Sequence, residues 1–388
     1  MSEKEQLLED GFVICRQVIP PRDLEKLRAS ADLLVERQGG RSWLGAGDAQ
    51  PRLTIASLAD GTTANAVEIW LAQRTQGLAS RLLCSPETAL TEMWIMCSPL
   101  TDHGPSHWHR DVHPIDMAPM QCLQADLVEN GPRYLQWNIP LYDDDVLWVV
   151  PGSHRRLNSA AENAQMHRDR RVPLPGSVPV ELRAGDGVAY VNYLLHWGSN
   201  YSTALRRTLH GGYSIFSLNG DIADDGFLSP AARETFAGWK TRTAQMQDLT
   251  ESALRAAGRG DGRAFFEALT ALQPGAGHAG RLVLSIYLCK AALLLRIVKN
   301  PDLGVPPALR KTSRTAHPIS LNWGPAFADR FSRDESETVW QRFAGLDAAL
   351  RGDEEQFVPG YQSGPMPYHF ETMPVAFGVD DLVAGWSS

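Results

Sequence analysis

The sequence lacks several features that would place it in a specialised class of protein. Its 388 residues include five cysteines, an odd number, and none of them forms a C-x-x-C pair. This usage argues against a disulfide framework and against a cysteine-rich zinc site, and it is typical of a reducing compartment. The polar, acidic start MSEKEQLLEDGF contains no apolar segment of the kind that directs secretion. We therefore expect a cytoplasmic protein.

Positive charge and long apolar runs are also scarce. Lysine and arginine total 37 against 45 acidic residues, which gives a formal net charge of −8. Nucleic acids and anionic membranes favour basic patches, so we expect neither as the main partner. The longest apolar stretch, residues 282–298, is interrupted by Lys290 and Arg296 and is shorter than the roughly 20 residues of a membrane-spanning helix. It predicts a buried helix.

What the chain does contain is a central region with the composition of β-strands. Between residues 89 and 216, short apolar or alternating runs rich in β-branched and aromatic residues are separated by turn sequences such as NGP and PGS. Many short strands without helices between them predict a sandwich or barrel rather than a parallel α/β sheet. One insert, residues 158–169, predicts a surface helix that begins with a capping box of Ser159 and Glu162.

Helical patterns flank this region on both sides. Near the N-terminus we expect a strand at residues 11–19 and then a helix that stops at Gly39-Gly40. Long helical patterns follow residue 230, and an irregular, proline-rich tail is expected to end the chain. We therefore predict an α+β protein in two parts. Residues 1–230 hold N-terminal helices and a β core, and residues 231–388 form a mostly helical extension that serves as a lid, a buttress or a homodimer interface.

The segment SHWHRDVHP contains the strongest candidate site. His107, His109, Asp111 and His113 occupy alternate positions, so an extended backbone would place all four side chains on one face. Imidazoles and a carboxylate gathered on one face are typical of a metal site. A second H-x-D triplet at residues 167–169 lies at the end of a charged helical stretch, MHRDRR, where a solvated surface is the expected interpretation.

A further ligand is available in His196, at the end of the apolar run VNYLLHW. Two histidines and one carboxylate on one face of an octahedral ion leave three positions open, which is the arrangement used by non-haem Fe(II) oxygenases. Closed tetrahedral zinc sites have no such vacancies. By alternation alone, His107 and His113 can reach the metal as well as His109, and His107-x-His109 also resembles the first ligand pair of a cupin.

The ordered motifs GFVIC, WHRDVHP, VVPGSHR, RAGDGVAYV with HWGSN, and RRTLHGGYS together resemble the phytanoyl-CoA dioxygenase family. The likeness extends from about residue 7 to residue 216. Members of this family are Fe(II)- and 2-oxoglutarate-dependent oxygenases. The resemblance therefore implies a double-stranded β-helix core of the jelly-roll or cupin type with flanking helices. It also implies Fe(II), 2-oxoglutarate and O2 as cofactor and cosubstrates.

By position, the resemblance assigns His109, Asp111 and His196 as the catalytic metal ligands. It assigns Arg207 to the far carboxylate of 2-oxoglutarate, a contact that suits the bidentate fork of an arginine. Adjacent strand residues face opposite sides, so only one of Arg206 and Arg207 can point inward. The spacing from the distal histidine favours Arg207.

Further residues take part in the same resemblance. Trp137 falls near a family position beside the cosubstrate, and Gln136 and Asn138 can instead contribute polar contacts there. His107 and His113 are expected around the metal or in the substrate pocket rather than as ligands. His154, in the motif PGSHR, is expected to be structural.

The resemblance implies an enzyme that oxidises an unactivated C–H bond of a small or medium-sized metabolite, such as a natural-product intermediate, and that forms succinate and CO2. Asp111 favours hydroxylation, because related halogenases carry a small residue at that position and leave room for chloride. Two alternatives stay open. One is a cupin-like metalloenzyme that uses His107 and no 2-oxoglutarate, and the other is a non-catalytic jelly-roll module that binds a metal or a small ligand.

Overall fold

The chain crosses three times between two structural units. The computed structural model describes residues 2–86, 88–199, 203–216, 225–317, 319–373 and 377–386. The first unit spans residues 1–111 and 132–242, and the second spans residues 112–131 and 243–388. The last crossing lies inside helix α8 (Pro230–Gly258). The sequence predicts a division at residue 230, and that division stays a prediction about which parts of the chain fold separately. It did not anticipate that residues 112–131 belong to the second unit.

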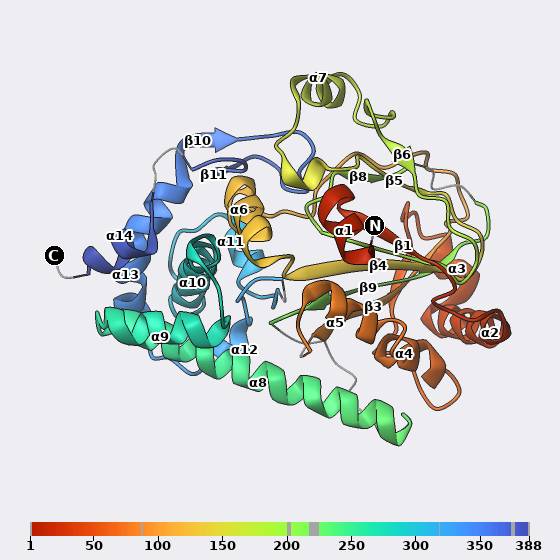
Figure 1. Ribbon diagram of the computed structural model, residues 1–388, viewed down its shortest axis with the longest axis horizontal. Coiled ribbons are helices and arrows are strands. Elements are labelled where there is room, and N and C mark those ends of the chain that lie inside the picture. The colour runs from red at the N-terminus through yellow and green to blue at the C-terminus, as the bar shows by residue number, and fades with distance from the viewer. Residues whose placement is uncertain are drawn as a thin grey trace. The chain divides into compact units, whose positions relative to one another are not determined.

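The first unit contains a six-stranded antiparallel sheet in the order β1-β7-β4-β9-β3-β2. Figure 1 labels β1, β4, β9 and β3 of this sheet. Its strands are β1 (Phe12–Cys15), β2 (Arg52–Thr54), β3 (Ala89–Cys97), β4 (Tyr134–Pro140), β7 (Gly187–Tyr190) and β9 (Arg207–Ser214). In the centre of the sheet, Trp94, His210 and Asn138 lie directly opposite one another on neighbouring strands. Residues that oppose each other in this way project from the same face. The register therefore decides which side chains share a face.

A smaller antiparallel sheet in the order β6-β5-β8 completes the β core. Its strands are β5 (Leu147–Val149), β6 (Val178–Pro179) and β8 (His196–Gly198). An isolated antiparallel bridge between His109 and His196 adds one more extended segment to this sheet. Two antiparallel sheets with flanking helices form the double-stranded β-helix core that the sequence predicts.

One face of the large sheet is apolar and covered by helices. The helices of the first unit are α1 (Glu3–Asp10), α2 (Pro21–Gln38), α3 (Gly40–Leu44), α4 (Ala64–Leu71), α5 (Gln76–Leu83) and α7 (Ala160–Arg168), with a 3-10 turn at Ser153–Arg155. Helix α4 packs on β3 and helix α5 packs on β4. The Tyr213 hydroxyl donates a hydrogen bond to the carbonyl of Trp70 in α4, at 2.6 Å. Burial of this face stabilises the sheet and leaves the opposite face for other uses.

Helix α7 begins as its sequence predicts. The Ser159 hydroxyl accepts the N–H of Glu162 at 3.2 Å, and the Glu162 carboxylate accepts the N–H of Ser159 at 2.7 Å. This reciprocal pair is the capping box that the sequence predicts. The helix ends at Arg168, and the flanking residues His167 and Asp169 of the second H-x-D triplet are exposed.

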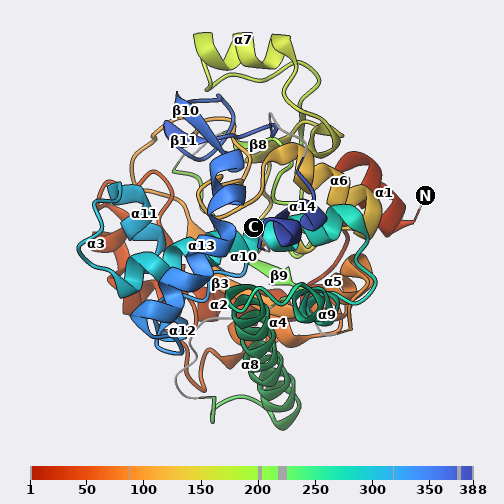
Figure 2. The same cartoon turned by 90° about the vertical axis from the view of Figure 1, so that its left-hand side faces the viewer.

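The second unit is arranged around helix α10 (His278–Lys299), which contains the long apolar stretch (Figure 2). Helices α6 (Met120–Asn130) and α13 (Arg333–Leu350) pack against it. Both interrupting charges are accommodated: the buried Lys290 places its Nζ 3.2 Å from the centroid of the Tyr368 ring, and Arg296 pairs with Glu337. The stretch is thus the buried helix that the sequence predicts. Within the described ranges, no helix is long and apolar enough to cross a membrane.

The end of the chain is more regular than the sequence analysis expected. The remaining elements of this unit are α9 (Gly262–Leu272), α11 (Pro307–Thr312), α12 (Pro325–Ala328), β10 (Arg351–Gln356), β11 (Met366–Tyr368) and α14 (Val379–Ala384). Helix α13 starts at a capping box of Ser332 and Glu335, a signal that was present in the sequence. The stretch between Pro325 and Pro359, which contains this helix, has no proline. Helix α6 likewise interrupts a region that was expected to contain only strands and one surface helix.

We expect Gly211→Ala to destabilise the first unit. A Cβ at this position in β9 would lie 2.5 Å from the carbonyl oxygen of Glu92 and 2.9 Å from the Trp70 ring, so neighbouring atoms must shift. Overpacking of this kind costs about 1–3 kcal/mol and should lower the midpoint of thermal unfolding. The matched control is Gly238→Ala in α8, where a Cβ meets open space and the helix gains about 0.5–1 kcal/mol. Equal shifts for the two variants would contradict this packing.

Candidate metal centre

Three side chains of the first unit converge on one point. His109, Asp111 and His196 each offer one ligand atom, and these atoms lie within 4.8 Å of one another. The Nε2 atom of His109 is 3.6 Å from Oδ1 of Asp111, and the Nε2 atom of His196 is 3.6 Å from Oδ2 of the same carboxylate. No other cluster of three or more such side chains occurs in the part of the chain that the structure describes. The two distant segments that the sequence singled out therefore meet.

Backbone pairing holds the two ligand-bearing segments together. The N–H of each of His109 and His196 donates to the carbonyl of the other, both at 2.9 Å. The N–H of Asp111 donates to the carbonyl of Asn192 at 2.8 Å, and the Asn192 side-chain amide donates back to the carbonyl of Asp111 at 2.9 Å. Because this segment is extended, its alternate side chains project from one face. This places the three ligand candidates on a rigid part of the unit.

Hydrogen bonds also set the orientation of both imidazoles. Nδ1 of His109 lies 2.9 Å from the carbonyl of His107, and Nδ1 of His196 lies 2.8 Å from the carbonyl of Leu194. A carbonyl oxygen only accepts, so Nδ1 carries the proton and Nε2 keeps its lone pair directed at the carboxylate. Burial and the neighbouring His196 lower the pKa of His109 to about 4, although Asp111 acts in the opposite direction. At neutral pH, His109 is therefore the neutral imidazole that binds metals.

This donor set fits a divalent iron ion. Two neutral imidazole nitrogens and one carboxylate oxygen occupy a single side and leave room for further ligands, which is the arrangement of non-haem Fe(II) sites. A structural zinc site would need a fourth protein ligand. The arrangement can therefore hold a metal ion and still admit other molecules to it.

The residue before the first ligand points the other way, into the protein. Trp108 is fully buried, and its ring lies 5.0 Å from that of Trp197, which follows the distal histidine. Both belong to an apolar cluster whose other members are Val150, Met166, Leu174 and Leu195. Alternation along the extended segment therefore places the Trp108 side chain in the apolar core behind the metal ligands.

The side of the large sheet that faces the metal ligands is polar. Nδ1 of His210 lies 2.6 Å from the amide oxygen of Asn138, and the side chain of Gln136 approaches its other ring nitrogen. Burial and the nearby Arg52 lower the pKa of His210 to about 3, although the nearby Asp111 acts in the opposite direction. Asn138 thus belongs to the polar side of the sheet, and its contact with the cosubstrate stays a prediction.

Arg52 and Trp94 also belong to this side, and the sequence analysis did not identify them. The Trp94 ring stacks on that of His210, with centroids 5.8 Å apart, and the guanidinium carbon of Arg52 lies 5.4 Å from the centroid of Trp94. The positive charge of Arg52 also contributes to the lowered pKa of His109, which places it near the metal ligands. Arg52 lies in β2, a strand of three residues that is too short to show a sequence pattern.

The structure places Trp137 away from the metal ligands. Its neighbours along β4, Gln136 and Asn138, face the metal side, so alternation turns Trp137 to the apolar face. The fully buried indole lies against Gly187, where an added Cβ would come within 3.1 Å of its ring. Trp137 therefore lies in the core and not beside the cosubstrate as expected. The family position was matched without considering which face of the strand the residue occupies.

The two adjacent arginines face opposite sides, as expected, but not in the expected order. Arg207 is buried under α2, where its Nε donates to the carboxylate of Asp32 at 3.1 Å. Its direct partner on β3 is Cys97, which belongs to the apolar face. Arg206 and Thr208 both donate to Asp144, at 2.6 and 3.0 Å. They alternate along the chain with His210 and therefore project from the same face as His210. The side of the sheet that faces the metal ligands therefore contains Arg206.

Asp144 is a buried carboxylate that stays charged. Burial alone would raise the pKa of Asp144, but the ion pair with Arg206 and hydrogen bonds from Val146 and Thr208 outweigh it and hold that pKa below its ordinary value. Asp144 uses only the Nε side of the guanidinium. Nη1 of Arg206 is buried and has no hydrogen-bond partner among the described residues. A buried donor in this state costs free energy until an acceptor reaches it.

The remaining histidines lie apart from the ligand triad. The His107 ring is 5.8 Å from that of His109, and burial lowers its pKa to about 4. His154 is buried with its Nε2 3.1 Å from the carbonyl of Leu8, a position that suits the structural role expected for it. His113 belongs to the second unit, where its ring lies 5.9 Å from that of His317. A role for His107 or His113 in the substrate pocket stays a prediction.

The chain is similar to several solved structures. They include the α-ketoglutarate-dependent epimerase SnoN from nogalamycin biosynthesis (21% identity, 55% of this chain and 82% of that chain, TM-score 0.41). AviO1 from Streptomyces viridochromogenes Tue57 is 25% identical over 55% of this chain and 93% of that chain, with a TM-score of 0.40. EctD from S. alaskensis is 15% identical over 59% of this chain and 82% of that chain, with a TM-score of 0.41. No curated protein matches the sequence.

A comparison with protein families gives a direct result. The family described as phytanoyl-CoA dioxygenase (PhyH) matches residues 7–208, slightly more than half of the chain. This range includes the three convergent side chains and both adjacent arginines. The chain therefore belongs to the phytanoyl-CoA dioxygenase (PhyH) family, within the Fe/2-oxoglutarate-dependent oxygenases.

Proposed function

We propose that the protein is a hydroxylase of a small or medium-sized metabolite. One oxygen atom of O2 enters an unactivated C–H bond, and the other enters succinate as 2-oxoglutarate loses CO2. The convergence of His109, Asp111 and His196 carries this proposal. Hydroxylation is favoured over halogenation because Asp111 fills the position that related halogenases leave to chloride.

Each ligand has a defined task in this proposal. Nε2 of His109, Nε2 of His196 and the carboxylate of Asp111 would hold the iron, which supplies the activation of O2 that side chains alone cannot perform. The carbonyls of His107 and Leu194 keep both imidazoles in the tautomer that binds metals. The protein thus contributes position and orientation to the chemistry.

Arg206, rather than Arg207, is our candidate for the far carboxylate of 2-oxoglutarate. A dicarboxylate that chelates the iron at one end needs a fixed cation on the same side as the metal ligands, and Arg206 has the parity of His210. Its buried Nη1 lacks an acceptor, whereas Arg207 is engaged with Asp32 on the opposite face. Arginine suits this contact because its planar fork can bind two carboxylates at different edges.

The first test compares the two H-x-D triplets. We expect Asp111→Ala to abolish succinate formation and the visible absorption band of the anaerobic Fe(II)–2-oxoglutarate complex, because the iron loses its only carboxylate ligand from the protein. Asp169→Ala is the matched control, since Asp169 is exposed at the end of α7, and it should retain both signals. An inactive Asp169 variant beside an active Asp111 variant would contradict the proposed site.

The second test separates the two arginines. A lost hydrogen bond to a charged group is worth about 1.5–3 kcal/mol, so Arg206→Gln should raise the dissociation constant of 2-oxoglutarate by about ten- to a hundredfold. Arg207→Gln should lower the thermal midpoint, because it removes the ion pair with Asp32. It should leave the dissociation constant of 2-oxoglutarate nearly unchanged, because Arg207 lies on the opposite face of the sheet. Both constants can be measured by anaerobic titration of the visible band. The reverse result would restore the assignment that sequence spacing favours.

The third test identifies the reaction. Purified protein with Fe(II), 2-oxoglutarate and a metabolite library should form succinate together with a product heavier by one oxygen atom. A product lighter by two hydrogen atoms would replace hydroxylation by desaturation or ring closure. Turnover without 2-oxoglutarate would favour the cupin-like alternative. Metal binding without turnover on any substrate would favour the non-catalytic module.

A further inference from the structure

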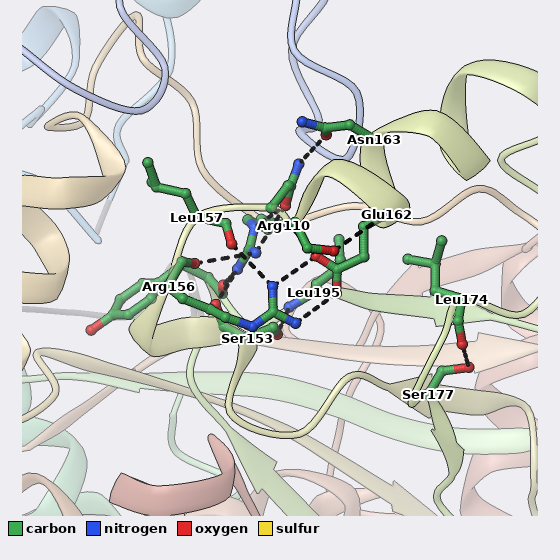
Figure 3. Close-up of polar contacts among 12 residues, drawn as sticks. Arg110, Ser153, Arg156, Leu157, Glu162, Asn163, Leu174, Ser177 and Leu195 are labelled. Carbon is green, nitrogen blue, oxygen red and sulfur yellow. Dashed lines mark hydrogen bonds and ion pairs between the residues drawn. The ribbon is translucent and has the colours of Figure 1, made fainter.

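We infer that Arg110, the residue between two of the ligands, is a positioning residue that fixes the geometry of the metal site from behind. This inference rests on the proposed iron site at His109, Asp111 and His196. It adds a function for a side chain that does not reach the metal. The place of Arg110 in the extended segment and the contacts of its guanidinium both indicate this role (Figure 3).

Arg110 is a fully buried arginine on the opposite side of the strand from the ligands. Its Nη1 donates to the carbonyl of Tyr193 at 2.6 Å and to the carbonyl of Ser153 at 2.9 Å. Its Nε and Nη2 donate to the amide oxygen of Asn158 at 3.2 and 2.9 Å, and Nη2 reaches the carbonyl of Arg156 at 3.5 Å. One guanidinium therefore joins the first ligand segment to two other segments of the chain.

Both segments lead back to the third ligand. Tyr193 lies in the turn that precedes His196, so its carbonyl ties that turn directly to Arg110. Ser153 acts on the same turn from the other side, because its hydroxyl accepts the N–H of Leu195 at 2.9 Å. Figure 3 shows Arg110, Ser153 and Leu195 close together in this network. The residue that separates two ligands thus also holds the turn that presents the third.

The geometry of the fork explains why this residue is an arginine. The planar guanidinium offers donors in fixed directions, and here they reach the carbonyls of Ser153 and Tyr193 and the side-chain amide oxygen of Asn158. A lysine has three donors on a flexible stem and cannot span these acceptors in the same directions. Residues that orient metal ligands from outside typically change metal affinity by about 10–100-fold when replaced.

An ion pair lies one step further out and provides the control. Arg156 binds both carboxylate oxygens of Glu162, at 2.7 and 2.6 Å, and thereby attaches the start of α7. Glu162 is buried, and its carboxylate is engaged by Arg156 and by the N–H of Ser159 at the start of α7. Glu162→Gln therefore disturbs the same region and leaves the contacts of Arg110 with Ser153 and Tyr193 in place.

The experiment measures metal affinity rather than turnover. Mn(II) serves as the probe, and its dissociation constant is obtained from the loss of the EPR signal of the free ion. Arg110→Lys should weaken Mn(II) binding by about tenfold or more at a temperature where the variant is folded. Asn158→Ala, which keeps the arginine but removes its side-chain acceptor, should give a smaller loss in the same direction. It tests the same idea if the lysine variant fails to fold.

The control decides between positioning and general stability. Glu162→Gln should lower the thermal midpoint and bind Mn(II) with unchanged affinity, because it weakens only the attachment of α7. The inference would be overturned if Arg110→Lys and Asn158→Ala bound Mn(II) like the wild type, or if Glu162→Gln lost as much affinity as they did. Failure of the wild type to bind Mn(II) would instead reject the proposed metal site.

Discussion

The site depends on one short piece of backbone pairing. Reciprocal hydrogen bonds between His109 and His196 bring together two segments that are far apart in sequence. These bonds set the distance between the imidazoles before any metal arrives, and the carbonyls that accept from each Nδ1 set their rotation. Because backbone hydrogen bonds already hold the ligand segments together, less conformational entropy remains to be lost when an ion binds. The affinity of the site is therefore largely a property of the sheet.

Side chains alternate between the two faces of the large sheet, and this alternation gives the two faces different environments. On one face, Leu209 and Tyr213 are buried against helices, and on the other His210 and Asn138 form a polar lining. Buried polar groups need hydrogen-bond partners. Some groups of this lining bond to one another, whereas the buried Nη1 of Arg206 has no partner among the described residues. A polar layer inside a β core is costly for stability alone, so its presence is a mark of function.

The sequence predicted the β core, the long buried helix and the three convergent side chains, because strand composition, apolar length and the H-x-D spacing are local or family-wide signals. It did not predict helix α13, although the capping box of Ser332 and Glu335 that opens this helix is present in the sequence. Trp137 and Arg207 were placed by counting residues, and counting ignores which face a strand residue occupies. Applying the alternation from His210 back through Thr208 would have selected Arg206. Arg52 depends on a three-residue strand and could be located only in three dimensions.

The carboxylate of Asp144 already offsets much of the charge of Arg206. An anion that binds Arg206 as proposed would therefore meet an almost neutral pair rather than a bare cation, and long-range attraction would contribute little to its capture. Recognition then depends on whether the anion's oxygens fit the unused edge of the guanidinium, which is a matter of shape. Binding at such a place should respond weakly to ionic strength, and it should discriminate among acids of equal charge by their length.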